Sequence, residues 1–505
     1  MKFKKLLLYS WIAAIAIFAS MHFSNLRADF PNYSRWMDWS KYTDEGWYGN
    51  AAIEYFVRGS WFVPGDFNCA AALPVWPFLE WILFHFTGVS LQAARALAVS
   101  LFVCNLVLAY ALLRANSERW VALLGTSLIA ASSFFFCFSR LAILEPLLIC
   151  LTLLSLLIAG RAAATTAQGR RLGLAALMGV LYCLMVLTKT TALFLLPAIL
   201  YALWYPQRKN LANFLRSAAA MGATAGLLFS AYFAMVVRHN YLQDYRYLFL
   251  VNVYTKPTTI LGWIVTFYYS VHGALWVDRT LVLLALAMVV TSLLIARSLW
   301  SNPLFVSSLL AVAGYFFFIG FHNNMQPRYY AVVAVFVFFI VALAAAALLR
   351  ANRAIGSVAV AVIVFSLVRN AQETIRFVRQ PEFTFVNAAR DLTRYMDAHP
   401  NGNRLLLSIS GNDITLITGL PSICDDFGTL DLPSRLQKYQ PGYYAAWNDL
   451  DPGTLEDLHT QYWLEQVATF PAFDDSDRNQ LVLFKLHPRP ADNPDVADLI
   501  RVPIE

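Results

Sequence analysis

Charged residues are scarce in this chain of 505 residues, since only 14% are Asp, Glu, Lys or Arg. Hydrophobic residues make up 59%, above the roughly 45–50% of a soluble globular protein. The mean hydropathy of +0.54 agrees with this imbalance. Apolar runs of about 20 residues recur through the first three quarters, which is typical of membrane-spanning helices. The composition therefore predicts a polytopic membrane protein.

Motifs of soluble enzymes are also missing. The six cysteines have no metal-ligand spacing. The sequence has no GxxxxGK phosphate loop, no GxGxxG turn after a strand and no Gly-x-Ser-x-Gly elbow. These absences argue against a soluble nucleotide as a sugar or phosphate donor. A disulfide between Cys69 and Cys424, the two cysteines outside the apolar runs, stays open.

About eleven apolar segments are candidates for membrane spans. They lie at 6–23, 91–113, 120–138, 141–160, 172–188, 190–204, 213–237, 280–297, 303–321, 329–349 and 354–369. With the N-terminus in the cytoplasm, every inner turn carries Lys or Arg and almost no acid, as the positive-inside rule requires. The net charge of +7 is explained by Lys and Arg in cytoplasmic turns beside anionic lipid headgroups, so it does not require a nucleic-acid partner. Eleven spans place the C-terminal segment outside.

Two domains follow from the change in composition near residue 370. Residues 1–370 form the transmembrane domain, with a first outer loop at about 24–90 and a second at 238–278. The first loop is rich in Trp and Tyr, which favour the headgroup zone, and it includes segments that could lie there as helices. The composition of residues 371–505 predicts a small α/β domain on the outer side. Within it we expect a helix at 385–398 and strands at 404–409, 414–417, 465–470 and 480–486.

Seven charged residues map to the outer ends of these segments. The acids are Asp44, Glu45 and Glu145, and the bases are Arg95, Arg140, Lys189 and Arg328. Charges beside membrane helices are costly to bury, so a group of them on one face indicates a function. Acids can accept a proton or hold a sugar, and bases can neutralise a phosphate leaving group. Each residue alone also fits a solvated surface, a snorkelling side chain or a local ion pair.

Two histidines, His272 and His322, lie near the same face. With Asp or Glu they leave a divalent metal open, but no ligand spacing marks a metal site. We therefore assign no metal-ligating residues and no certain cofactor.

The order of the charged motifs resembles a known family. An outer loop opening with Asp44-Glu45 is followed by Arg140…Glu145-Pro146 and, late in the membrane, by Gln326-Pro327-Arg328-Tyr329. This arrangement over about residues 1–370 resembles the GT-C glycosyltransferases, in the branch of protein O-mannosyltransferases and bacterial aminoarabinose (lipid A) transferases. Residues 69–77 depart from it, since they lack the Lys of the Glu-Lys-Pro-Pro stretch of aminoarabinose transferases.

The resemblance implies an enzyme of the inner or plasma membrane that uses a polyprenyl-phosphate sugar on the outer side. Asp44 matches the catalytic base, and Glu45 matches a neighbour that helps to bind acceptor or sugar. Arg140 and Glu145 match the Arg…acid pair of the second outer motif, whose base faces the lipid phosphate. The expected reaction transfers the sugar, with inversion, to a hydroxyl of a lipid, glycan or protein acceptor. Membrane lipids are expected to surround the enzyme.

Two other classes remain open from the sequence. A transporter or flippase of sugar-linked lipids would use intramembrane charges as a pathway and would often have repeated halves, and no internal repeat is apparent. A non-catalytic assembly protein would use its outer domain to bind a partner. Release of lipid phosphate separates a transferase from both.

Overall fold

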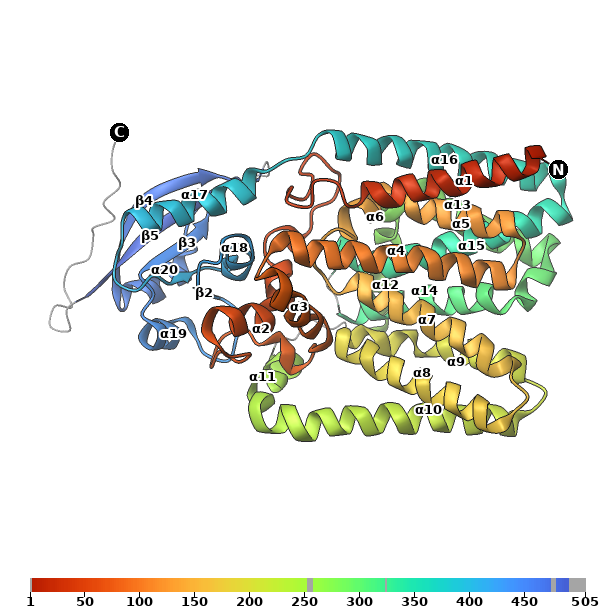
Figure 1. Ribbon diagram of the computed structural model, residues 1–505, viewed down its shortest axis with the longest axis horizontal. Helices are drawn as coiled ribbons and strands as arrows, with labels where there is room; N and C mark the ends of the chain where they lie inside the picture. The colour runs from red at the N-terminus through yellow and green to blue at the C-terminus, as the bar shows by residue number, and fades with distance from the viewer. Residues whose placement is uncertain (1, 252–257, 323–324, 474–477, 490–505) are drawn as a thin grey trace.

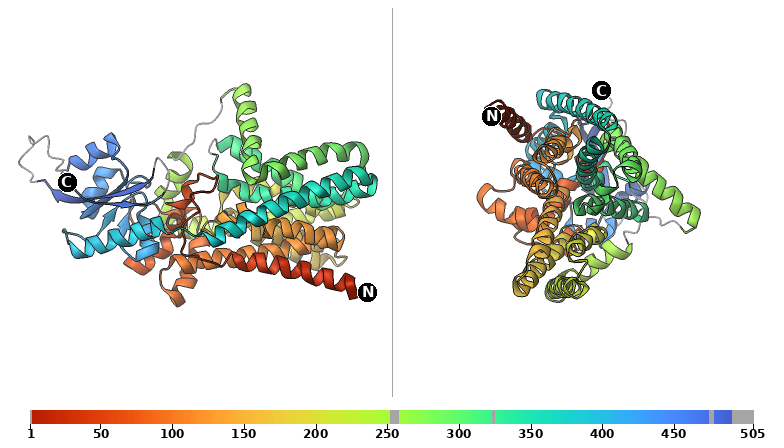
Figure 2. Two further views of the ribbon diagram at one scale, coloured as in Figure 1. Left: turned by 90° about the horizontal axis from the view of Figure 1, so that it is seen from above. Right: turned by 90° about the vertical axis from the view of Figure 1, so that its right-hand side faces the viewer.

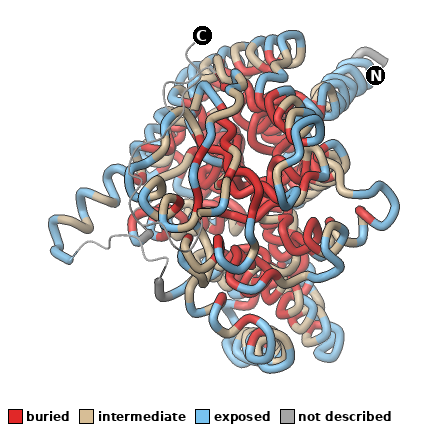
Figure 3. The backbone as a smooth tube through the Cα atoms, turned by 90° about the vertical axis from the view of Figure 1, so that its left-hand side faces the viewer, coloured by how far each residue is buried: buried red, intermediate tan, exposed pale blue. Residues whose placement is uncertain are grey.

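The computed structural model describes residues 2–251, 258–322, 325–473 and 478–489. A long helical bundle occupies one end of the molecule, and a small α/β domain sits on the other end (Figure 1). The N-terminus lies at the end of the bundle far from the α/β domain. Seen from the side of the α/β domain, buried residues fill the centre and exposed residues ring the outside (Figure 3).

Helices occupy all eleven segments predicted to cross the membrane. The bundle consists of α1 (Lys2–Met21), α4 (Leu91–Asn116), α5 (Arg119–Ala130), α6 (Ser133–Phe138), α7 (Glu145–Ala164), α8 (Gln168–Thr188), α9 (Leu196–Trp204), α10 (Leu211–Tyr232), α13 (Leu275–Ile295), α14 (Pro303–His322), α15 (Tyr330–Ala351) and α16 (Arg353–Arg379). Within the described residues, eight helices are long and apolar enough to cross a membrane, and α1 and α5 are shorter apolar helices. The predicted polytopic helical fold is confirmed.

The centre of the bundle is α15, which packs against α5, α13, α14 and α16. Its sequence is apolar on every side, as expected for a helix surrounded by other helices. In the most apolar stretch of α15, 89% of the residues are buried. The corresponding share is 11% for the helix that begins at Leu211, at the edge of the bundle. The rim helices therefore present their apolar sides outward, to lipid.

Four short helices lie at the end of the bundle that faces the α/β domain. The first outer loop forms α2 (Asp44–Arg58) and α3 (Val75–Thr87), and the second forms α11 (Leu242–Arg246) and α12 (Ile260–Gly273). Helix α12, which lies within the expected second outer loop, projects sideways from the bundle (Figure 2). Ile260 and Leu261 are 82% and 70% exposed, so α12 offers an apolar surface of the kind that lies in a membrane interface.

The C-terminal domain is a mixed sheet with helices. Its elements are α17 (Thr384–Ala398), β1 (Leu406–Leu407), α18 (Gly411–Thr418), β2 (Ser422–Ile423), α19 (Leu432–Tyr439), β3 (Tyr443–Trp447), α20 (Pro452–His459), β4 (Tyr462–Pro471) and β5 (Gln480–Pro488). The strand order is β2-β1-β3-β5-β4, in which β1 runs parallel to β2 and β3 while β5 is antiparallel to β3 and β4. The predicted α/β domain is confirmed.

Several local expectations are wrong or differ in detail. The segment 414–417 was expected as a strand but belongs to helix α18, and strands β2 and β3 were not foreseen. Helix α16 continues to Arg379, beyond the expected boundary at 370. Cys69 and Cys424 share one apolar cluster but are both free thiols, so the structure does not hold the disulfide that the sequence left open.

Candidate functional site

Asp44 and Glu45 form the first turn of α2, and both are buried, with 3% and 1% of their surface exposed. Neighbouring residues of a helix point about 100° apart because a turn takes about 3.6 residues. The two carboxylates therefore face different partners, Asp44 toward Arg328 and Glu45 toward Arg95. The adjacent pair in the sequence thus divides into two separate ion pairs.

Asp44 belongs to a buried three-membered group. Its Oδ2 lies 2.8 Å from Nη2 of Arg328, and the hydroxyl of Thr43 donates to its Oδ1 at 3.2 Å. Arg328 also forms an ion pair with Asp38, whose Oδ2 accepts the backbone N–H of Arg328 at 2.9 Å. Burial raises the pKa of Asp44 above its usual range, and the Arg328 charge opposes that rise. A buried carboxyl whose pKa is shifted by burial and by a specific charged partner is a candidate functional group.

Another ion pair links α7 to α8. Glu145 begins α7, with Pro146 in the second position, and Lys189 directly follows Thr188, the last residue of α8. Their side chains form a buried ion pair, and the Lys189 ammonium also lies 4.4 Å from the centre of the Tyr329 ring. Glu145 therefore pairs with Lys189, while Arg140, its neighbour in the sequence, has other partners.

Asp44, Lys189 and Arg328 line one cavity of about 190 Å³ between the bundle, the first outer loop and the C-terminal domain. Its other lining residues are Trp39, Trp47, Tyr48, Phe67, Ala72, Leu73, Leu144, Thr190, Thr191, Leu248, Phe249, Phe318, Tyr329 and Phe427. Glu145 holds Lys189 without lining the cavity itself. The structure thus brings a carboxylate and two cations, from three distant parts of the sequence, to one small chamber among aromatic rings.

Glu45, Arg95 and Arg140 do not line this chamber. Arg95 holds Glu45 with two bonds of 2.8 and 2.5 Å, and Glu45 also accepts the backbone N–H of Ala142 at 2.7 Å. Arg140 donates to the backbone carbonyls of Ser24 and Asn25 at 2.5 and 2.8 Å. These contacts tie the first loop to α4 and to the segment before α7. Their predicted part in catalysis or phosphate binding stays a prediction.

Three residues at the site were not singled out from the sequence. Asp38 shares Arg328 with Asp44, Tyr48 lines the chamber one turn along α2, and Asp413 reaches α2 from the C-terminal domain. Asp38 and Tyr48 stand in the same aromatic loop as Asp44, so their proximity was available as a signal. Asp413 gave none, because it lies directly before the segment 414–417, which was expected to be a strand and not part of a helix that packs on α2.

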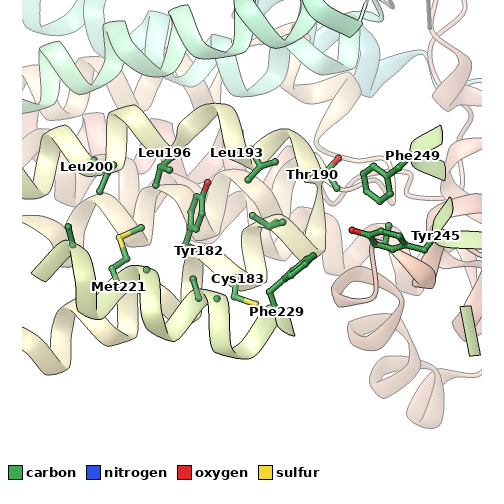
Figure 4. Close-up of a pocket in the computed structure, with 16 residues that line it drawn as sticks. Tyr182, Cys183, Thr190, Leu193, Leu196, Leu200, Met221, Phe229, Tyr245 and Phe249 are labelled. Carbon is green, nitrogen blue, oxygen red and sulfur yellow. The ribbon is translucent and has the colours of Figure 1, made fainter. Parts of the chain in front are cut away.

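An apolar groove of about 600 Å³ lies beside the chamber, between α8, α9 and α10. Ala72, Thr190 and Phe249 line both spaces. The groove extends from Thr190 and Phe249 along the helices to Leu200 and Met221 (Figure 4). It offers an extended apolar ligand a path that ends next to Lys189.

No group of three or more His, Cys, Asp or Glu side chains suited to a metal ion occurs within the described part of the chain. His272 lies in the last turn of α12, and the side chain of His322 is outside the described part. The positive charges that the described residues bring to the chamber are those of Lys189 and Arg328.

Comparison with protein families gives one match. Residues 71–235, about a third of the chain, match the sequence model of the family described as dolichyl-phosphate-mannose-protein mannosyltransferase. The matched region includes Arg95, Glu145 and Lys189 but not Asp44 or Arg328. A search of curated protein sequences gives no match.

Solved structures similar to this chain cover nearly all of it. ArnT from Cupriavidus metallidurans in the apo state has a TM-score of 0.62 at 12% identity, over 95% of this chain and 98% of ArnT. The same protein bound to undecaprenyl phosphate has a TM-score of 0.59 at 12% identity, over 94% of this chain and 98% of ArnT. The apo oligosaccharyltransferase of Archaeoglobus fulgidus has a TM-score of 0.55 at 11% identity, over 94% of this chain and 76% of that enzyme. The chain therefore has the GT-C fold, and the resemblance noted in the sequence is confirmed at the level of fold.

Proposed function

We propose that this protein is a membrane glycosyltransferase that moves a sugar from a polyprenyl-phosphate donor to an acceptor hydroxyl. The observation that carries the proposal is the join between the chamber and the apolar groove. A polyprenyl phosphate has one anionic end and a long apolar tail, and the two spaces match these two parts. The undecaprenyl phosphate bound to ArnT, a protein of the same fold, supports this class of donor.

In this proposal the donor phosphate binds near Lys189 and Arg328. Lys189 directly precedes Thr190, which lines both the chamber and the groove. Lys189 and Arg328 are held in place by their pairs with Glu145, Asp38 and Asp44 before the donor arrives, so they need no rearrangement to contact its phosphate. The isoprenoid tail occupies the groove between α8 and α10.

Asp44 is the base of the proposed reaction. Its carboxylate takes the proton of the acceptor hydroxyl, and the oxygen attacks the anomeric carbon of the donor sugar. The bond between that carbon and the phosphate oxygen breaks, and its electron pair leaves with the polyprenyl phosphate beside Lys189 and Arg328. A single displacement of this kind inverts the anomeric centre. Because the chamber lies at the end of the bundle that bears the C-terminal domain, the proposed reaction takes place at that membrane face.

The test uses the purified full-length protein in lipid nanodiscs with labelled polyprenyl-phosphate sugars of several kinds. Wild type is expected to release polyprenyl phosphate and to transfer the label. Asp44→Asn is expected to slow transfer by about 10²–10⁴-fold, the usual contribution of a general base. Because Asn has the size of Asp, the variant should insert and unfold like wild type. Transfer by Asp44→Asn near the wild-type rate would remove Asp44 from the role of base.

The same assay separates the alternative classes. Movement of the donor across the bilayer without release of lipid phosphate would indicate a transporter or flippase. Absence of both, with unchanged complex formation in the cell envelope after Asp44 and Glu145 are neutralised, would indicate an assembly protein. Addition of a chelator to the active reaction tests for a divalent metal, and loss of transfer that Mg²⁺ or Mn²⁺ restores would establish one.

A further inference from the structure

The first turn of α2, which carries Asp44, lacks a cap of its own. The first four N–H groups of a helix have no partner within it, and a Ser, Thr, Asp or Asn at the N-cap usually binds one of them. Thr43 occupies this position in α2, but its side chain makes no capping bond and turns to Asp44 instead. Some other group must therefore accept a hydrogen bond from the backbone N–H groups of this turn.

The C-terminal domain supplies that group. Oδ2 of Asp413, in the first turn of α18, accepts the backbone N–H of Gly46 at 3.1 Å. Gly46 is the third residue of α2, which is the position that an N-cap side chain normally reaches. The capping acceptor thus comes from a residue 367 positions further along the chain.

The two helices also fit closely at this point. A Cβ atom at position 46 would overlap the backbone of Asn412 and Asp413, so only glycine allows α18 to lie against α2 here. Trp47 donates from its indole N–H to the carbonyl of Ile409 at 3.2 Å. Asp413 is buried, with 3% of its surface exposed. The contact is therefore tight enough to fix where the first turn of α2 lies.

We propose that Asp413 is a positioning residue of the catalytic centre, which caps α2 from the C-terminal domain and so holds Asp44 in its place beside Arg328. This inference rests on the proposed function of Asp44. It gives the C-terminal domain a part in catalysis, since the domain completes the helix end that presents the base. Burial, together with the nearby Glu45, raises the pKa of Asp413 well above its usual range. The bond from Gly46 needs only an oxygen acceptor, which a neutral carboxyl or an amide also provides.

The test measures kcat, the donor KM and hydrogen exchange for variants of the full-length protein in nanodiscs. Asp413→Ala removes the acceptor, and Asp413→Glu moves it by one methylene. Both are expected to lower kcat by roughly tenfold to a hundredfold, because a displacement of about 1 Å can have that effect. The donor KM should stay unchanged, since Asp413 does not line the chamber or the groove. Asp413→Asn keeps an acceptor of the same size and should retain most of the wild-type kcat.

A matched control exists at the same domain boundary. Asp66 of the first loop is also buried, and its Oδ1 accepts the backbone N–H of Cys424 at 3.2 Å, away from the first turn of α2. Asp66→Ala is expected to lower thermal stability while leaving kcat near wild type. Amide exchange in residues 44–50 should become faster in Asp413→Ala and stay unchanged in Asp66→Ala.

The outcomes decide between positioning and simple stability. A wild-type kcat in Asp413→Ala, or in Asp413→Glu if the Ala variant does not fold, would overturn the inference. So would an Asn variant as slow as the Ala variant, because the carboxyl itself would then be required. If wild type transfers no sugar, the proposed function fails, and the exchange of residues 44–50 still reports whether Asp413 holds the turn.

Discussion

Arg328 pairs with two carboxylates at once, and its charge and that of Asp38 both act on the pKa of Asp44. Its guanidinium contacts Asp38 and Asp44 with different nitrogens. Burial raises the pKa of Asp44, Arg328 lowers it, and the negative charge of Asp38 raises it. Arg328 thus opposes the combined effects of burial and of Asp38 on the pKa of Asp44.

Loss of the Arg328 charge is expected to shift the pH dependence of transfer. In Arg328→Gln the largest of the effects that lower the Asp44 pKa disappears, so Asp44 becomes harder to deprotonate. The acidic limb of the kcat/KM profile should move to higher pH, and Arg328→Lys should move it less. A profile of kcat/KM between pH 5 and 9 tests this. A limb that stays in place or moves to lower pH in Arg328→Gln would contradict the pairing of Asp44 with Arg328.

At the scale of single residues, the sequence predicted which charged residues come together better than it predicted which of them form ion pairs. Scarce charges at helix ends identified Asp44, Lys189 and Arg328, and the structure brings these three to one chamber. The partners could not be predicted, because they depend on how helices pack. Glu145 pairs with Lys189, 44 positions away, where a local pair with Arg140 was open from the sequence. Short-range spacing carries no information on such contacts.

Helix α10 forms the outer wall of the apolar groove, and its glycines leave room there. Gly222 and Gly226 lie one helical turn apart and both line the groove. A Cβ atom at either position would meet no other atom within 4 Å. The groove is therefore wide at α10 because these positions lack side chains. Its width follows from the sequence of one helix.

Filling the groove is expected to weaken binding of long donors without harming the fold. Gly222→Leu should raise the KM for a long-chain polyprenyl donor by about tenfold, since loss of one or two methylene contacts costs roughly 1–2 kcal/mol. A short-chain donor that does not reach Gly222 should bind as before. KM measured for both donors tests this. The control is Gly160→Leu on α7, which also has open space around its Cβ and lies outside the groove; an equal effect there would contradict the assignment.

At the element scale, the long apolar runs and three of the four expected strands were predicted correctly, and only the shortest run, 414–417, was wrong. Eleven apolar segments became helices because burial in a bilayer leaves a chain few other structures. The run 414–417 has four residues, which cannot separate a strand from a buried helical turn. Its helical form goes with its packing against α2, a contact that the local sequence does not contain. The error thus fell within α18, the helix whose Asp413 accepts the N–H of Gly46 in α2.

The whole molecule is polarised along its length. The turns of the bundle that carry most Lys and Arg lie at the end away from the C-terminal domain, the end that also holds the N-terminus (Figure 1). By the positive-inside rule we expect this end to face the cytoplasm, which would place the C-terminal domain outside. The inner- or plasma-membrane location stays a proposal.

Cysteine labelling tests this orientation. Ala167→Cys lies in an exposed inner turn between α7 and α8, and Glu456→Cys lies on the surface of α20. A membrane-impermeant thiol reagent added to intact cells or spheroplasts should label the cysteine at 456 and not that at 167. Both should react after the membrane is opened. The reverse pattern in intact cells would invert the topology and place the reaction in the cytoplasm.

The cap of α2 by Asp413 also has a consequence for biosynthesis. The two halves of this contact are 367 positions apart, so a ribosome must add most of the chain before the second half exists. Until residue 413 has been made, exported and folded onto α2, the first turn of that helix has no acceptor for Gly46. A growing chain can thus insert its helices before the first turn of α2 is held in place. Under the proposed function, the order of synthesis itself delays sugar transfer until the C-terminal domain has folded onto α2.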